Sequence, residues 1–133
     1  MEPMDLLQRV LDGMFPKVLN LRLIEASTDR VSAEMDVTPE VCTTGSVLHG
    51  GAIMTLADFL GASATFLNLP KNANTTTLES KTNFIGAARV GETVVATCEP
   101  VHKGGRTQVW RTTIMQADGK PVAIVTQTQM VLE

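Results

Sequence analysis

The apolar segment from Leu48 to Asn68 (LHGGAIMTLADFLGASATFLN) constrains the fold more than any other part of the chain. A helix at the surface of a small protein normally has one polar face with several charges. Between Gly50 and Leu67 the only charged side chain is that of Asp58. The segment must therefore be surrounded on most sides, either by lipid or by protein.

A membrane span does not suit this segment. At about 1.5 Å per residue it is long enough to cross a bilayer. However, it has an aspartate at its centre, several glycine and hydroxyl residues, and no basic or aromatic anchors before it. Most of the remaining chain is strand-like. We therefore expect protein to surround the segment, and no association with a membrane.

The composition excludes some classes of function. The chain has 133 residues, of which 44% are hydrophobic, and this suits one domain with an ordinary core. A net charge of −3 and a single tryptophan without tyrosine argue against nucleic-acid binding. The two cysteines, Cys42 and Cys98, match no zinc spacing, and the first residues do not resemble a signal peptide. We expect reduced thiols and a cytoplasmic protein.

Hydrophobic periodicity predicts the order of the elements. We expect helices at about 4–13 and 50–67, a loop at 38–48, a hairpin turn at Gly104-Gly105 and strands at 18–26, 30–37, 74–84, 92–102, 106–116 and 122–132. Consecutive antiparallel strands with one long helix indicate the α+β class, with the helix packed on one face of the sheet. Residues 1–133 are expected to form a single domain.

The long helix has two different faces. The face expected to contact the sheet consists of Ile53, Leu56, Ala57, Leu60, Ala64 and Leu67. The opposite face is small and nearly uncharged, and consists of Gly51, Met54, Thr55, Asp58, Ala62 and Thr65. We expect a second copy of the helix to cover this face across a two-fold axis. The alternative is that a loop or the first helix covers it.

Two features of this helix suggest chemistry. Asp58 would be partly buried by dimerisation, which makes it a functional candidate; alternatively, nearby hydroxyl or amide groups bind it structurally. His49-Gly50-Gly51 begins the helix with free N–H groups that could hold an anion or a carbonyl oxygen; alternatively, the glycines only form a tight turn. Eight residues of helix separate Gly50 from Asp58 by about 12 Å. The two features could therefore meet only between antiparallel helices of two subunits.

Several motifs resemble those of one family. They are His49-Gly50-Gly51 followed by Leu56-Ala57-Asp58, then Asn83-Phe84-Ile85, Ala88-Arg89-Val90-Gly91-Glu92 and Lys103-Gly104-Gly105-Arg106. Together, over residues 15–132, they resemble the hotdog-fold acyl-CoA thioesterases of the phenylacetate-degradation type. This resemblance implies an antiparallel sheet of five to six strands wrapped around the central helix. It also implies dimers that pair into tetramers, an acyl-CoA substrate, and neither metal nor separate cofactor.

The resemblance also assigns roles to residues. Asp58 would be the general base or the nucleophile, and the Gly50 N–H would polarise the thioester carbonyl with help from His49. Thr77 falls where the family often has a hydroxyl near the attacking water. Thr43 stands where many members have an asparagine that contacts the reaction centre, and its hydroxyl can hydrogen-bond there with a different reach.

Substrate-binding residues are expected around these groups. Gly51, Met54, Phe59 and Phe84 are candidates to line the acyl pocket, although they could equally belong to the core. Arg89, Lys103 and Arg106 are candidates to bind the CoA phosphates, or they are solvated surface charges. A non-catalytic acyl-CoA-binding protein and a hotdog hydratase or dehydratase remain alternative functions. The acyl preference stays open.

Overall fold

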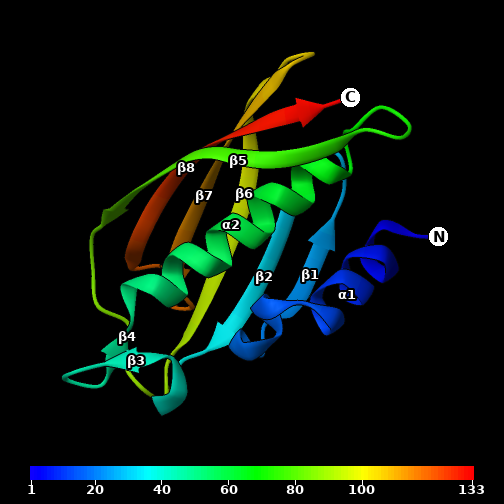
Figure 1. The fold of residues 1–133 in the computed structure, drawn as a ribbon. Helices are drawn as coiled ribbons and strands as arrows, with labels where there is room; N and C mark the ends of the chain where they lie inside the picture. Colours follow the sequence, from blue (N-terminus) through cyan, green and yellow to red (C-terminus); the bar gives the residue numbers. More distant parts are fainter.

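The computed structural model describes residues 1–133 (Figure 1). The elements are α1 (Pro3–Gly13), η1 (Phe15–Leu19), β1 (Arg22–Ala26), β2 (Val31–Asp36), η2 (Pro39–Val41), β3 (Cys42–Thr43), β4 (Val47–Leu48), α2 (Gly50–Phe66), β5 (Asn74–Phe84), β6 (Thr93–Lys103), β7 (Thr107–Gln116) and β8 (Pro121–Leu132). The predicted α+β class, the long helix and the last four strands are confirmed. None of the helices has the length and apolar character needed to cross a membrane.

The main sheet has six antiparallel strands in the order β1-β2-β6-β7-β8-β5. It curves around α2, which contacts β2 and the four strands from β5 to β8 (Figure 1). The predicted hotdog arrangement is therefore confirmed. Two edges of the sheet, β1 and β5, have no neighbouring strand on their outer side.

The core lies between α2 and the concave face of the sheet. Leu56 and Leu60 of α2 are fully buried there, with Trp110 and Ile114 of β7. Burying a large apolar side chain contributes about 1.5–3 kcal/mol to the free energy of folding. Burial also raises the pKa of the Cys98 thiol to about 12, so this cysteine is a neutral core residue.

The pairing of β5 with β8 contains one irregularity. The register shifts by one residue between Thr77 and Glu79, which marks Leu78 as a β-bulge. Before the bulge Thr77 pairs with Gln129, and after it Phe84 pairs with Ala123. Gln129 and Ala123 are both buried, so both ends of β5 turn one set of side chains towards α2.

Two expectations from the sequence were wrong in detail. The predicted strand at 18–26 begins only at Arg22, because Pro16 starts the 3₁₀ turn η1 and Asn20 ends it with a left-handed backbone (φ 51°). The predicted loop at 38–48 contains the turn η2 and the short hairpin of β3 and β4. Two-residue strands are too short to show a period of two in the sequence.

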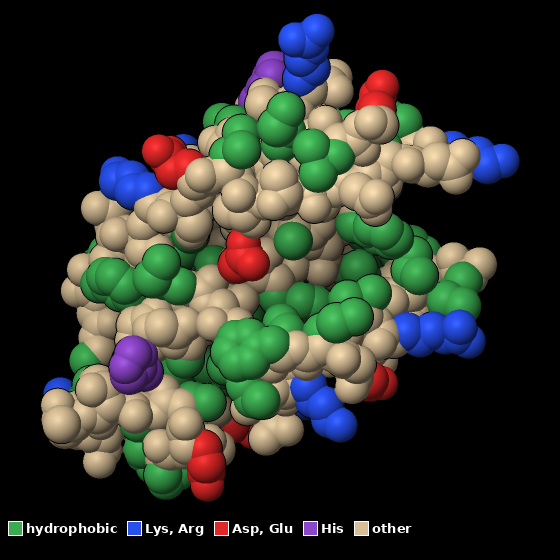
Figure 2. Space-filling view, in the orientation of Figure 1, with side chains coloured by type: hydrophobic (Ala, Val, Ile, Leu, Met, Phe, Trp, Pro, Cys, Tyr) green, Lys and Arg blue, Asp and Glu red, His purple; other side chains and the backbone are tan.

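The face of α2 that was expected to lie away from the sheet partly contacts β5 and β8 and is partly covered by the chain itself. Thr65 was expected on this open face but is fully buried, and its hydroxyl donates to the Gly61 carbonyl at 2.8 Å. The turn η1 packs against α2, so the alternative of an intrachain cover is correct in part. Gly51, Met54 and Asp58 stay exposed. Figure 2 shows mainly neutral and hydrophobic side chains over α2, with one acidic side chain near the middle.

Candidate functional site

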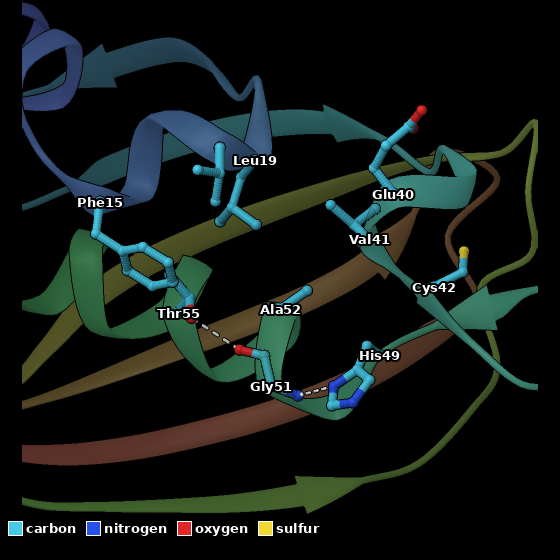
Figure 3. A pocket seen from close by; sticks show the side chains of 10 residues that line it. Phe15, Leu19, Glu40, Val41, Cys42, His49, Gly51, Ala52 and Thr55 are labelled. Atoms are coloured by element: carbon cyan, nitrogen blue, oxygen red, sulfur yellow. Dashed lines mark hydrogen bonds between the residues drawn. The ribbon is translucent and has the colours of Figure 1, made fainter.

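The N-terminus of α2 leaves one backbone donor without a partner. His49 is the N-cap, and its Nδ1 accepts a hydrogen bond from the Gly51 N–H at 2.8 Å (Figure 3). The Gly50 N–H makes no hydrogen bond within the chain. Because Nδ1 is an acceptor, the proton of a neutral His49 ring lies on Nε2. The helix start therefore offers the Gly50 N–H and the His49 Nε2–H to a ligand.

A cavity of about 320 Å³ adjoins this helix start (Figure 3). Its walls come from η1, η2, the start of β3, and the N-cap and first two turns of α2, and they are Phe15, Val18, Leu19, Glu40, Val41, Cys42, His49, Gly51, Ala52 and Thr55. Thr43 is not among these residues, because it lies one position further along β3 and is exposed. The structure thus brings His49 and Gly51 to the cavity but not Thr43.

The carboxylate of Asp58 lies two turns further along α2. Its Oδ1 accepts hydrogen bonds from the Thr77 hydroxyl at 2.8 Å and from Gln127 Nε2 at 3.3 Å. The structure therefore brings the predicted pair Asp58 and Thr77 together, and it also meets the structural alternative of a hydroxyl partner. A second cavity, of about 380 Å³, is lined by Phe15, Pro16, Met54, Thr55, Asp58 and Ser80.

Two glutamines beneath Asp58 were not predicted. Gln127 and Gln129 of β8 are each only 1% exposed. Gln129 Oε1 accepts from the Thr77 hydroxyl at 2.6 Å and from Gln127 Nε2 at 3.0 Å, and Gln129 Nε2 donates to Thr75 at 3.1 Å. The sequence contains a pattern that could have identified these two glutamines as inward-facing. The two glutamines alternate in register with Val125 and Val131, which places polar side chains on the apolar face of a strand.

Gly61 of α2 makes room for the Gln127 amide. A Cβ at Gly61 would lie 2.2 Å from the Cδ and Oε1 atoms of Gln127. We expect Gly61→Ala to lower the free energy of unfolding by about 1–3 kcal/mol through overpacking, in spite of the better helix propensity of alanine. Gly13→Ala is the matched control, because nothing lies within 4 Å of its Cβ position. Urea denaturation measures both, and equal effects would contradict the role assigned to Gly61.

The residues predicted to line the acyl pocket are divided between the start of α2 and the surroundings of Asp58. Phe84 is 57% exposed, and its ring lies 3.2 Å from the position that a Cβ of Gly50 would occupy. Met54 is partly exposed and lies in the cavity that contains Asp58. Phe59, in contrast, is 6% exposed and belongs to the core. The N–H of Gly51 is already used by His49.

The three basic residues expected to bind phosphate do not converge in one chain. The backbone of Arg89 forms an isolated antiparallel β-bridge with Val47, beside the N-terminus of α2. Lys103 and Arg106 flank the β6–β7 hairpin turn, at the opposite end of the sheet (Figure 1). Lys103 is also engaged, because its Nζ lies 2.6 Å from Asp29 Oδ1 and 5.9 Å from the centre of the Trp110 ring. Within one subunit these residues cannot share a ligand phosphate.

The two halves of the candidate site are also separate in one chain. The Gly50 N–H and the Asp58 carboxylate are about 12 Å apart along the helix axis, too far to act on the same atom. The open edge of β5 lies beside both halves, and Leu78, Phe84 and Ile85 along it are 55%, 57% and 51% exposed. A strand edge with exposed apolar residues is a surface on which another chain can pair.

Comparisons with known proteins show the family and the fold of the chain. Residues 45–123 match the family described as the thioesterase superfamily. The chain is 31% identical to a 1,4-dihydroxy-2-naphthoyl-CoA hydrolase from Escherichia coli, over 82% of this chain and 79% of the relative. A mutant thioesterase from Pseudomonas aeruginosa superposes with a TM-score of 0.90 at 28% identity, covering 97% and 93% of the two chains. A hypothetical thioesterase from Streptococcus pneumoniae, solved with coenzyme A, has a TM-score of 0.82 at 23% identity, with coverage of 96% and 95%.

Proposed function

The chain belongs to the thioesterase superfamily and is a thioester hydrolase, and we propose that it cleaves acyl-CoA to a free acid and CoA at sites shared by two subunits. One observation carries this proposal. A free N–H at the helix start and a carboxylate with a hydroxyl partner lie on the same open side of α2, but about 12 Å apart. Two antiparallel copies of α2 would bring the Gly50 end of one subunit to Asp58 of the other.

The open edge of β5 supports this assembly. Two β5 strands that pair antiparallel across a two-fold axis would continue the sheet and would bury the exposed Leu78 and Ile85. The same axis would make the α2 helices antiparallel, with Gly51 and Thr55 allowing close approach. We propose this dimer, and dimers of dimers beyond it, as the active form.

The proposed reaction uses one group from each half of the site. The thioester carbonyl oxygen accepts a hydrogen bond from the Gly50 N–H, with the His49 Nε2–H as a second donor. The Asp58 carboxylate of the other subunit accepts a proton from a water molecule, and the water oxygen attacks the carbonyl carbon. The C–S bond then breaks, and the thiolate of CoA takes up the proton from Asp58. No metal or further cofactor is part of this proposal.

The ligand is proposed from the site and from the relatives. The Escherichia coli relative is named as a CoA-thioester hydrolase, and the Streptococcus pneumoniae neighbour holds coenzyme A. The mostly apolar cavity beside His49 suits an acyl group. In the proposed dimer, Arg89 of one subunit would approach the hairpin with Lys103 and Arg106 of the other, where CoA phosphates could bind. We propose a cytoplasmic location, in which Cys42 and Cys98 stay reduced.

The test is turnover of a panel of short, medium, long and aryl acyl-CoAs. We expect release of free thiol, detected with a chromogenic thiol reagent, and the best substrate identifies the acyl class. Crotonyl-CoA is included because loss of its enoyl absorbance without thiol release would indicate a hydratase. Tight binding of CoA with no turnover of any substrate would indicate a binding protein. Either of these two results would overturn the proposal.

Mixing of two inactive variants tests the shared site. Asp58→Asn removes the carboxylate, and Gly50→Pro removes the N–H at the helix start. Refolded together, half of the dimers contain one copy of each, and each mixed dimer has one intact site, so we expect about a quarter of the wild-type activity. Each variant refolded alone is the control. If the site lay within one chain, the mixture would stay as inactive as its components.

A further inference from the structure

The Thr77 hydroxyl has two acceptors within reach. Its Oγ1 lies 2.8 Å from Asp58 Oδ1 and 2.6 Å from Gln129 Oε1. A hydroxyl has one hydrogen, so it can donate to only one of these oxygens at a time. While Asp58 is ionised, one of the two short contacts therefore joins two acceptors.

The neighbouring hydrogens are fixed by the charge of Asp58. Gln127 Nε2 has two hydrogens, one directed to Asp58 Oδ1 at 3.3 Å and one to Gln129 Oε1 at 3.0 Å. Turning over the Gln127 amide would place its oxygen against the carboxylate and leave its N–H groups without a partner. Gln129 Nε2 is in turn held by Thr75 at 3.1 Å. The Thr77 hydrogen is therefore the one that can move between Asp58 and Gln129.

We propose that Gln127 and Gln129 are positioning residues for Asp58, and that Gln129 receives the Thr77 hydrogen bond when Asp58 takes up a proton. The inference rests on the proposed role of Asp58 as a base. The ionised carboxylate attracts the Thr77 hydroxyl, because hydrogen bonds to charged acceptors are the stronger ones. When a water O–H bond breaks and its proton binds to Asp58, that charge is lost. The Thr77 hydrogen stays on Oγ1 and turns towards Gln129 Oε1, so no buried group loses its partner.

The cost of this arrangement supports a functional role. Both glutamines are 1% exposed, and Gln127 Oε1 is buried without any hydrogen-bond partner. A buried polar atom without a partner destabilises the folded state, because it loses its hydrogen bonds to water. The helix also carries a glycine, Gly61, where any side chain would collide with Gln127. Apolar residues at these two positions of β8 would pack at lower cost, but they could not hold the Asp58 and Thr77 oxygens.

The experiment is a double-mutant cycle on the acyl-CoA that the wild type cleaves best. We expect Gln129→Leu and Thr77→Val each to lower kcat about 10- to 100-fold, with KM changed less than about twofold. The double variant should be no slower than the slower single variant, because the two groups act as one unit. Thr77→Ser keeps the hydroxyl and should keep kcat within about threefold of the wild type. If Gln129→Leu does not fold, Gln129→Met replaces it in the double-mutant cycle.

Gln108→Leu is the matched control. Gln108 is 3% exposed and lies opposite Gln129 on β7, but it hydrogen-bonds to Trp110 and not to the Asp58 cluster. We expect its kcat to stay near the wild-type value. Additive losses in the cycle, a raised KM at constant kcat, or an equal loss in Gln108→Leu would overturn the inference. Failure of the proposed function looks different, because the wild type and Gln108→Leu would then release no thiol either.

Discussion

Replacement of Asp58 by asparagine should lower kcat for acyl-CoA hydrolysis by about a hundredfold to ten-thousandfold, the range that a general base contributes. Asparagine has the same size, and its amide oxygen can still accept the hydrogen bond that Thr77 donates at 2.8 Å. It cannot accept a proton from water, and it cannot attack a thioester as a carboxylate can. Release of free thiol under saturating substrate measures the effect.

Asp12→Asn provides the matched control for this change. Asp12 is an exposed acid of α1 that accepts a hydrogen bond from Gln8 at 2.9 Å, and it lines neither cavity of the candidate site. We expect its activity to equal that of the wild type. If Asp58→Asn stayed folded, kept its oligomeric state and remained fully active, the carboxylate would have no part in the chemistry.

The second large effect is expected at Gly50. Two substitutions there distinguish the effect of losing the N–H from the effect of adding a side chain. Gly50→Pro removes the donor at the first position of α2, where proline suits the helix backbone. His49 before it is extended, with φ −65° and ψ 137°, as a residue before proline should be. Gly50→Ala keeps the N–H. We expect kcat of the proline variant to lie about 10²- to 10³-fold below that of the alanine variant, the usual effect of losing one donor to a developing oxyanion.

The alanine variant also controls for crowding. A Cβ at Gly50 lies 3.2 Å from the Phe84 ring, and both variants carry this atom. Equal losses in the two variants would mean that displacement of Phe84, and not the missing N–H, lowers the rate. Comparison of the circular dichroism spectrum of each variant with that of the wild type measures whether the helical content is retained.

The sequence predicted the long elements because they repeat their pattern many times. The helix from Gly50 and the last four strands each contain several periods of apolar residues, and Gly104-Gly105 identifies one connection between them. The turn η1 was mistaken for the start of a strand because Val18, Leu19 and Leu21 look strand-like in isolation. Their backbone is set instead by Pro16 and by packing on α2, which local periodicity does not reveal.

Site residues could be predicted where they lie close together in the sequence or where they match a family motif. His49, Gly50 and Asp58 lie on one helix, so their spacing follows from the sequence, and Thr77 came from the family resemblance. Gln127 was missed because a polar residue in a strand is usually assigned to solvent, although its alternation with Val125 and Val131 places it on the apolar face. The phosphate candidates were grouped by charge, although the strand predicted at 92–102 already separates Arg89 from Lys103 by its whole length. Arg89 and Lys103 lie at opposite ends.

The bulge at Leu78 changes which residues of β5 face α2, from odd-numbered positions before it to even-numbered positions after it. Ahead of it Thr77 faces the helix, and beyond it Phe84 does, as their partners Gln129 and Ala123 require. If Leu78 were instead paired with β8 in a regular ladder, Glu79 and Lys81 would point into the site, and Phe84 would turn away from Gly50. A one-residue insertion or deletion between Glu79 and Phe84 would turn Phe84 away from α2, whereas deletion of Leu78 itself would leave Thr77 and Phe84 on the same inner face.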